Sequence, residues 1–182
     1  MNRKADSPQG GPASGSVQLR TATPADFSLL ERWHRQPHLK AALGDDDWQW
    51  AKELGRNPAW REQLIAEVDG RPIGFLQSID PAHEDSHYWG SIEEGHRALD
   101  LWIGEPEALG RGYGTQILNL AIERSFADPA VKAILVDPME TNTLAHRFYE
   151  RLGFQYVACR RFGDDCCFVY RLRRPGTATR EG

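Results

Sequence analysis

Residues 109–116, Leu-Gly-Arg-Gly-Tyr-Gly-Thr-Gln, combine three alternating glycines with an arginine directly before a helical pattern. Glycine has no Cβ, so a ligand can come close to the backbone. A helix that begins here points its unpaired N–H groups and the positive end of its dipole at the loop. This spacing suits the binding of a phosphate or pyrophosphate, and Arg111 adds a side-chain cation. A tight turn without a ligand would use the same glycines, so the neighbouring segments must decide between these interpretations.

The neighbouring segments place the glycine loop in a strand–loop–helix–strand unit. Residues 98–103 have the pattern of a strand, apolar residues recur at helical spacing from Ile117 to Phe126, and residues 131–136 form a second apolar run. A connection of this kind is right-handed and makes its two strands parallel. The G-x-G-x-G spacing differs from the G-x-G-x-x-G of dinucleotide-binding folds, and the Gly-Lys-Ser/Thr of a Walker loop is absent.

The loop from Leu109 to Gly114 resembles the Q/R-x-x-G-x-G/A loop of the GNAT acyltransferases, which holds the pyrophosphate of acetyl-CoA. Leu109 departs from the Gln or Arg that many members carry there. Asp137-Pro138 and the segment from Asn142 to Phe154, with its Gly-Phe ending, resemble the block that follows in the family. The resemblance covers residues 17–172. It implies that acetyl-CoA is the co-substrate, bound by Leu101, Trp102, Ile103, Leu109, Gly110, Arg111, Gly112, Tyr113, Gly114, Thr115 and Asn142.

Asp100 lies inside the predicted strand 98–103, where an acidic residue is disfavoured. By alternation it shares a sheet face with Ala98 and Trp102. A solvated face is the simplest explanation of this residue. The resemblance instead places the end of the strand beside the thioester, where a carboxylate binds an ammonium group and helps to remove its proton, so that the neutral amine can attack. Asp100 is therefore predicted to be catalytic.

Tyr149 falls on the apolar face of a predicted helix that begins after Asn142, so a role in the core is open. The resemblance matches it to the tyrosine that protonates the departing CoA thiolate in many GNAT enzymes. Both roles are compatible, because a ring can pack while its hydroxyl reacts. Asn142 is expected to cap the helix, and the resemblance also places it near the pantetheine arm of the cofactor.

Acidic residues and tryptophans gather in the segments expected to line the acceptor cleft. The acids are at positions 45–47, 84–85, 93–94, 100, 137 and 140, and the tryptophans are at 48, 50, 89 and 102. Such clusters are usually solvated surface, and Asp137 could merely begin a turn with Pro138. A cleft of this sign with aromatic rings would, however, attract and stack a polycation. The predicted substrate-binding residues are Trp89, Asp100, Asp137 and Glu140.

Thiol and metal chemistry have weaker support in the sequence. Cys159, Cys166 and Cys167 have no histidine beside them, and we expect buried hairpin thiols, so that the amine attacks the thioester directly. His83 and His87 have the i, i+4 spacing of a metal-binding pair only on a helix, which Pro81 and the polar surroundings oppose. No metal site is expected.

The composition bounds the class of protein. The chain has 182 residues, of which 40% are hydrophobic, and a formal net charge of −4, values that suit one globular domain and disfavour nucleic acid as the partner. The sequence has no apolar run of membrane length and no signal core, so membrane insertion and export are not expected. Three cysteines suit a reducing compartment, and we expect a cytoplasmic location.

The expected architecture is a mixed α/β domain over residues 17–172, between a disordered tail (residues 1–16) and a loose tail (residues 173–182). Its central sheet is mostly antiparallel and flanked by helices, and the parallel middle strands 98–103 and 131–136 splay where acetyl-CoA enters. Thr23 and Pro24 mark a helix start. Further expected elements are strands at 17–21, 63–68, 73–79, 156–161 and 166–172, hairpin turns at Asp69-Gly70 and Gly163-Asp164, a short helix near Trp50 and a long polar loop over 81–96.

The resemblance implies transfer of an acetyl group from acetyl-CoA to a primary amine. The closest likeness is to the aminoglycoside 6′-N-acetyltransferases, through residues 74–78, 99–100, 109–115 and 137–142. A related branch acylates the hydroxylysine of siderophores and carries His where this chain has Asp100. A non-catalytic acyl-CoA-binding protein is a third possibility. The expected partner is a small polyamine or aminoglycoside, and the protein is expected to be a monomer or a homodimer.

Overall fold

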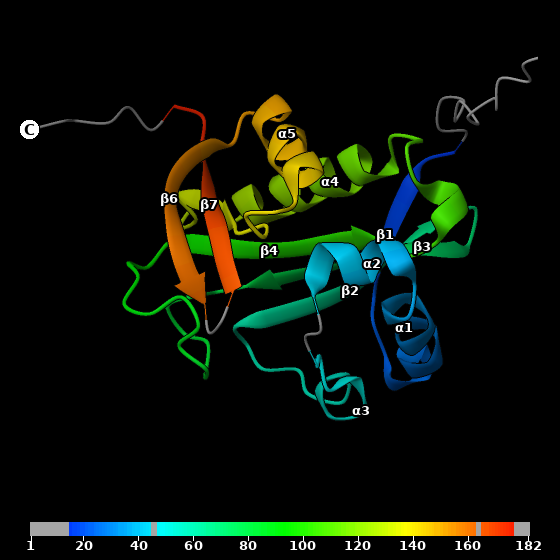
Figure 1. Ribbon diagram of the computed structural model, residues 1–182. Coiled ribbons are helices and arrows are strands. Elements are labelled where there is room, and N and C mark those ends of the chain that lie inside the picture. Colours follow the sequence, from blue (N-terminus) through cyan, green and yellow to red (C-terminus); the bar gives the residue numbers. More distant parts are fainter. Residues whose placement is uncertain (1–14, 45–46, 163–164, 177–182) are drawn as a thin grey trace, which may run out of the picture.

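The computed structural model describes residues 15–44, 47–162 and 165–176. These residues form a seven-stranded sheet in the order β1-β2-β3-β4-β5-β7-β6 (Figure 1). The strands are β1 (Val17–Thr21), β2 (Arg61–Val68), β3 (Arg71–Ile79), β4 (His96–Ile103), β5 (Ala133–Val136), β6 (Gln155–Phe162) and β7 (Asp165–Arg173). The α-helices are α1 (Phe27–His34), α2 (Pro37–Leu43), α3 (Trp50–Glu53), α4 (Tyr113–Ala127) and α5 (Thr143–Arg151), and short 3-10 turns cover Pro24–Asp26 and Pro106–Ala108.

The sheet confirms the predicted mixed fold. All pairs of neighbouring strands are antiparallel except β4 and β5, which are parallel and are joined through α4. The β2–β3 hairpin turns at Asp69 and Gly70, both of which have positive φ, as the sequence predicted. Asn142 caps α5 as predicted, since its side chain accepts a hydrogen bond from the Ala145 N–H at 3.1 Å.

The parallel strands separate halfway along β4. The pairing runs only from His96 opposite Ala133 to Ala98 opposite Leu135. Beyond that point the chain after β5 is tied to β7 instead, because the Phe168 N–H donates to the Pro138 carbonyl at 2.9 Å. Residues 99–103 of β4 therefore have β3 on one side and an opening on the other.

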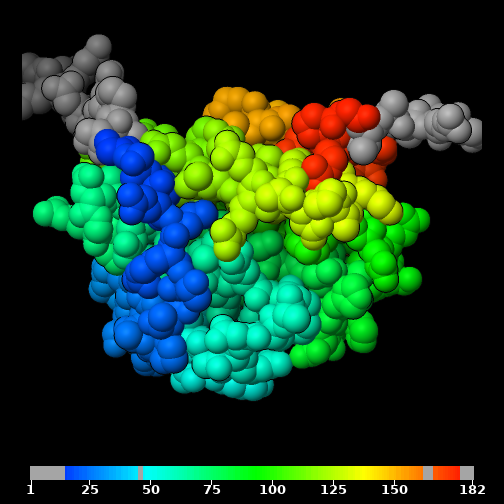
Figure 2. All heavy atoms as spheres, turned by 180° about the vertical axis from the view of Figure 1, so that it is seen from behind, coloured from blue at the N-terminus to red at the C-terminus, as the bar shows by residue number. Residues whose placement is uncertain are grey.

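Helices cover the sheet on both faces. The first core cluster lies between the sheet and α4 and α5, and it contains Leu99, Ile117, Leu118, Ile134 and Tyr149. A second cluster, on the opposite face, joins Trp102 and Phe75 to α1, α2 and α3. In Figure 1, α4 and α5 lie above the sheet, α1 and α3 lie in the lower part of the view, and α2 crosses in front of the sheet. Seen from behind in Figure 2, α4 (yellow-green) crosses the upper part of the molecule. No helix among the described residues is long and apolar enough to cross a membrane.

Three features differ from the expected architecture or lie outside the described residues. Helix α2 was not predicted, although Pro37 at its start and Gly44 at its end are typical helix boundaries. The C-terminal boundary was too early, because β7 includes Arg173 and the Arg174 guanidinium donates to the carbonyls of Phe126, Asp128 and Val131. Residues 1–14 of the predicted N-terminal tail, the predicted turn at 163–164 and residues 177–182 lie outside the described residues.

Candidate active site

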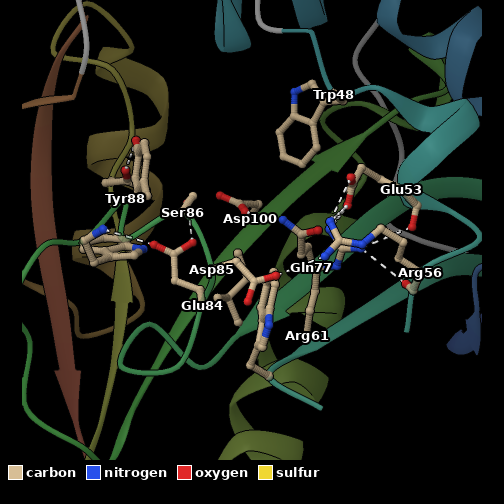
Figure 3. A pocket seen from close by; sticks show the side chains of 14 residues that line it. Trp48, Glu53, Arg56, Arg61, Gln77, Glu84, Asp85, Ser86, Tyr88 and Asp100 are labelled. Carbon is tan, nitrogen blue, oxygen red and sulfur yellow. Dashed lines mark hydrogen bonds and ion pairs between the residues drawn. The ribbon is translucent and has the colours of Figure 1, made fainter. Parts of the chain in front are cut away.

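Two cavities meet at the opening between β4 and β5. The larger cavity has a volume of about 360 Å³, within the range of small-molecule sites. It lies on the side of α3 and of the loop over residues 80–95 (Figure 3). The narrower cavity, of about 200 Å³, runs between α2 and α5. Asp100, Asp137 and Tyr88 line both cavities, so they form the junction between them.

Asp100 is held by a row of amides across three strands. The Gln77 side-chain N–H₂ donates to Asp100 Oδ2 at 3.0 Å, and Gln63 donates to Gln77 Oε1 at 2.9 Å. Gln77 is buried and lies directly opposite Asp100 on β3. A buried amide that both donates and accepts fixes the position of the carboxylate, which is more than a solvated face requires. Neither glutamine was predicted as a site residue.

Asp137 and Tyr88 form the other side of the junction. The Tyr88 hydroxyl donates to Asp137 Oδ2 at 2.8 Å. Burial and the neighbouring Asp100 carboxylate raise the pKa of Asp137 to about 8, because two close carboxylates resist carrying two charges. The Asp137 carboxyl therefore holds a proton at neutral pH, and the pair presents less than its full negative charge until a cation arrives.

The raised pKa of Asp137 predicts a dependence of stability on pH. A carboxyl with a higher pKa in the folded than in the unfolded chain stabilises fully below its unfolded pKa, and this stability is lost as the pH rises through about 8. Asparagine does not titrate, so Asp137→Asn lacks this loss. The melting temperature of the variant minus that of the wild type should therefore increase by about 2–4 °C or more from acid to alkaline buffer. Differential scanning fluorimetry over this pH range measures it. Melting curves that stay parallel throughout would contradict the assignment.

Tyr149 reaches the narrower cavity from α5. Its side chain is 7% exposed and packs with Phe154 and Tyr170 in the core. It also lines the narrower cavity together with Asp100 and Asn142, so packing and access to the cavity coexist. Burial, with a further contribution from Asp100, raises the pKa of the Tyr149 hydroxyl well above its usual range. The phenol therefore keeps its proton, which is the state a proton donor requires.

The glycine loop has the geometry of an anion cradle. Gly110 and Gly112 have φ of +69° and +85°, and Cβ atoms built on them would meet no atom within 4 Å. Their lack of a side chain thus serves the backbone conformation and leaves open space above the loop. Helix α4 begins at Tyr113, so the N–H groups of Gly114 and Thr115 fall in its first turn, outside the helical hydrogen-bond pattern. These features fit the pyrophosphate of a CoA thioester.

The predicted residues of β4 reach the cofactor region unequally. Leu101 and Trp102 line the narrower cavity. Ile103 is already engaged, because His38 Nε2 lies 2.9 Å from its carbonyl oxygen. Tyr113 is buried in the core, whereas Arg111 lies over the Tyr113 ring with 5.8 Å between Cζ and the ring centroid.

Two predicted substrate-binding residues are displaced from the junction. Trp89 is 3% exposed and packs against Ala98, Leu135 and Val169, so most of its ring belongs to the core although it contributes to the wall of the larger cavity. Its neighbour Tyr88 reaches Asp137 instead. Glu140 is exposed and lies outside the residues that line the two cavities. Its backbone N–H donates to the Cys166 carbonyl at 2.8 Å.

The cysteines differ from the expected set of buried thiols. Only Cys167 is buried, and it lines the narrower cavity; Cys159 is exposed, and Cys166 is partly buried. The Cys159 and Cys166 sulfurs lie 2.8 Å apart across the β6–β7 hairpin, and this contact raises the pKa of Cys166 to about 12. A thiol so shifted is a poor nucleophile at neutral pH. Among the residues that the structure describes, no three His, Cys, Asp or Glu side chains converge as metal ligands.

Residues 22–162 match the family described as an acetyltransferase (GNAT) domain. The chain belongs to the GNAT acetyltransferases. It is thus an acetyltransferase that takes acetyl-CoA as co-substrate. The opening between β4 and β5 and the glycine loop are the elements of this GNAT domain that fit the thioester and the pyrophosphate.

Two proteins and one crystal structure illustrate which GNAT enzymes this chain is similar to. The aminoglycoside N(6′)-acetyltransferase type 1 of Klebsiella pneumoniae is 29% identical over 153 residues, which cover 79% of this chain and 76% of the relative. The lysine N-acyltransferase MbtK of Mycobacterium tuberculosis is 26% identical over 174 residues, 88% of this chain and 79% of the relative. The crystal structure of AAC(6′)-Ib with coenzyme A and kanamycin superposes with a TM-score of 0.78 at 26% identity, covering 87% of this chain and 95% of that chain. These relatives are transferases, which favours an enzyme over an acyl-CoA sensor.

Proposed function

We propose that this GNAT protein acetylates a primary amine of a polycationic small molecule, with the 6′-amine of an aminoglycoside as the preferred acceptor. The observation that carries the proposal is the position of Asp100, where the two cavities meet. We assign the larger cavity to the acceptor and the narrower cavity to the cofactor. The acceptor cavity is lined by five acidic side chains, of which only Asp137 is assigned a proton at neutral pH, and by two arginines, so its charge suits an amine-rich ligand. Similarity to an aminoglycoside N(6′)-acetyltransferase and to AAC(6′)-Ib with kanamycin bound supports this acceptor class.

The side chains of the junction divide the proton transfers between them. An ammonium bound beside Asp100 and Asp137 loses its proton to this carboxylate pair, and the neutral nitrogen attacks the thioester carbon. The new C–N bond replaces the C–S bond, and the Tyr149 hydroxyl donates its proton to the departing thiolate. The second proton that the attacking nitrogen loses then returns to the Tyr149 oxygen, so that the products are the amide and free CoA with one proton left on the carboxylate pair. Gln77 holds Asp100 in place throughout, because its amide remains hydrogen-bonded to Oδ2. General acid and base steps of this kind contribute about 10²–10⁴-fold each.

Tyr149→Phe tests the proton donor. The ring stays in the core while the hydroxyl is lost, so turnover is expected to fall at least about tenfold with little change in acetyl-CoA affinity. Steady-state kinetics and calorimetric titration of acetyl-CoA measure the two quantities separately. Tyr156→Phe, which removes the hydroxyl of an exposed tyrosine on β6, is the matched control. Full turnover in Tyr149→Phe would assign Tyr149 to packing alone and leave water as the proton source.

A second candidate acceptor is the side-chain amine of a lysine derivative. The similarity to the lysine N-acyltransferase MbtK favours this alternative. It requires the same attack of an amine on a thioester, but on an acceptor that also carries a carboxylate. The acidic lining of the larger cavity disfavours such an acceptor relative to a polycation.

The direct test is an acceptor screen. The protein is incubated with acetyl-CoA and with aminoglycosides, aliphatic polyamines or lysine derivatives, and free CoA is detected with a thiol reagent. We expect release to be fastest with aminoglycosides that carry a 6′ amine and absent with analogues that carry a 6′ hydroxyl. Faster release with lysine derivatives would favour the second candidate, and acetyl-CoA binding without release for any amine would refute the proposal.

A further inference from the structure

The larger cavity contains two arginines among its acidic side chains, and they differ in exposure. The Arg61 side chain is 8% exposed, and its Nη1 donates to Glu53 Oε2 at 2.7 Å, so Arg61 is a fixed part of the wall. The Arg56 side chain is 42% exposed and lies at the mouth of the cavity. A cation at this position has to be explained, because it opposes the entry of another cation.

Arg56 joins the two sides of the cavity mouth. Its Nη2 donates to Asp85 Oδ2 at 3.0 Å, and its Nη1 lies 3.2 Å from Glu53 Oε1. Arg56 follows α3, whereas Asp85 belongs to the loop over residues 80–95, and both line the cavity (Figure 3). The Arg56 guanidinium thus forms an ion pair with Asp85 at the outer end of the cavity, and Asp100 lies at the inner end of the same cavity.

This contact can be exchanged at little cost. The Asp85 side chain is 67% exposed, and ion pairs this exposed contribute little to stability. Arg56 would keep its ion pair with Glu53 after leaving Asp85, so neither charge would be left without a partner. A ligand ammonium can therefore replace the Arg56 guanidinium at Asp85.

We propose that Arg56 is a specificity-determining residue, which competes with the second ammonium of a polyamine for Asp85. This inference rests on the proposed function, since it assumes that the reacting amine lies at Asp100. A monoamine needs only the Asp100 end and does not meet this competition. A diamine long enough to span both ends must displace Arg56, so the wild-type protein discriminates against small diamines. Acceptors with several ammonium groups overcome the competition by their additional contacts.

Arg56→Gln tests the proposal with putrescine and n-butylamine, which have the same carbon chain and differ by one ammonium group. The variant should lower KM for putrescine about fivefold and leave KM for n-butylamine nearly unchanged, because one exposed ion pair is removed. Arg35→Gln is the matched control, since Arg35, directly after α1, forms an exposed ion pair with Glu31 at 3.1 Å and its loss changes the net charge equally. Asp85→Asn should raise KM for putrescine, and Arg56→Gln should bring no gain in the Asp85→Asn background.

Calorimetric binding of both amines to the protein with coenzyme A separates this inference from the proposed function. Tighter putrescine binding in Arg56→Gln without any CoA release would support the role of Arg56 and refute acetylation. Equal gains for both amines, the same gain in Arg35→Gln, or a gain that survives Asp85→Asn would overturn the competition. Failure of n-butylamine to bind the wild-type protein, or of putrescine to bind Arg56→Gln, would overturn it as well.

Discussion

Asp100→Asn is expected to lower kcat/KM for amine acetylation by about a hundredfold to ten-thousandfold, the usual contribution of a general base. The substitution keeps the size of the side chain and its acceptor for the Gln77 amide, but it removes the charge that holds the ammonium and takes its proton. A residue used in both binding and chemistry should lower kcat and raise the amine KM together. Steady-state kinetics over a range of amine concentrations resolves the two changes.

Two controls keep this result specific for the reaction. Acetyl-CoA affinity should barely change, because the glycine loop lies beyond the end of β4. The melting temperature should hold or rise, since burial raises the pKa of Asp137 and the variant removes the Asp100 charge that raises it further. Wild-type turnover in Asp100→Asn would refute the catalytic role of Asp100.

Gly112→Val is expected to weaken acetyl-CoA binding at least about a hundredfold, equivalent to two charge-assisted backbone hydrogen bonds. Valine is disfavoured at a φ of +85°, and its side chain would project into the open space above the loop. Calorimetric titration measures the affinity, and circular dichroism checks the fold.

Gly176→Val separates lost binding from backbone strain. Gly176 has a φ of +87° with no atom near its built Cβ. It follows Arg174, whose guanidinium donates to the carbonyls of Phe126 and Asp128 at the C-terminal end of α4, whereas the glycine loop lies at the start of α4. Both valine variants carry similar strain, but only Gly112→Val should lose affinity. Unchanged affinity in a folded Gly112→Val variant would place the pyrophosphate elsewhere.

Local sequence patterns were sufficient to predict the parallel pair and the glycine loop. The alternation of side chains along β4 predicted that Asp100 and Leu99 lie on opposite faces of the sheet. In the structure, Leu99 lies in the core against α4. The spacing of the glycines before an apolar helix placed the start of α4. Each of these features depends on neighbouring residues alone, so the sequence contains the information directly.

The support of Asp100 could not be read from the sequence, because it depends on strand register. The turn at Asp69 and Gly70 alone would pair Gln63 with Leu76, but a bulge between Ala66 and Glu67 shifts the pairing by one residue. Gln63 is thereby brought opposite Gln77, and Gln77 opposite Asp100. The sequence offered one indication of this support, namely the polar Gln77 inside the apolar strand 73–79.

The position of Tyr88 at the junction could not be predicted from the sequence either, for a physical reason. The loop over residues 80–95 has no periodicity from which side-chain directions follow. Trp89 was predicted as one of the tryptophans that would stack a polycation among the acidic residues. It is buried against β4 and β7, and Tyr88 reaches Asp137. Which of two adjacent aromatics faces a cavity is decided by tertiary packing, here by the apolar cluster that accepts the indole.

The measurement that tests the central claim most directly is mass spectrometry of the acceptor after reaction with acetyl-CoA, with free CoA quantified in the same sample. The account predicts that an aminoglycoside with a 6′ amine gains one acetyl group on that nitrogen, with one CoA released per acetyl transferred, and that Asp100→Asn leaves the acceptor unmodified over the same period. An unmodified acceptor with the wild-type protein, or the same product at the same rate with Asp100→Asn, would contradict it.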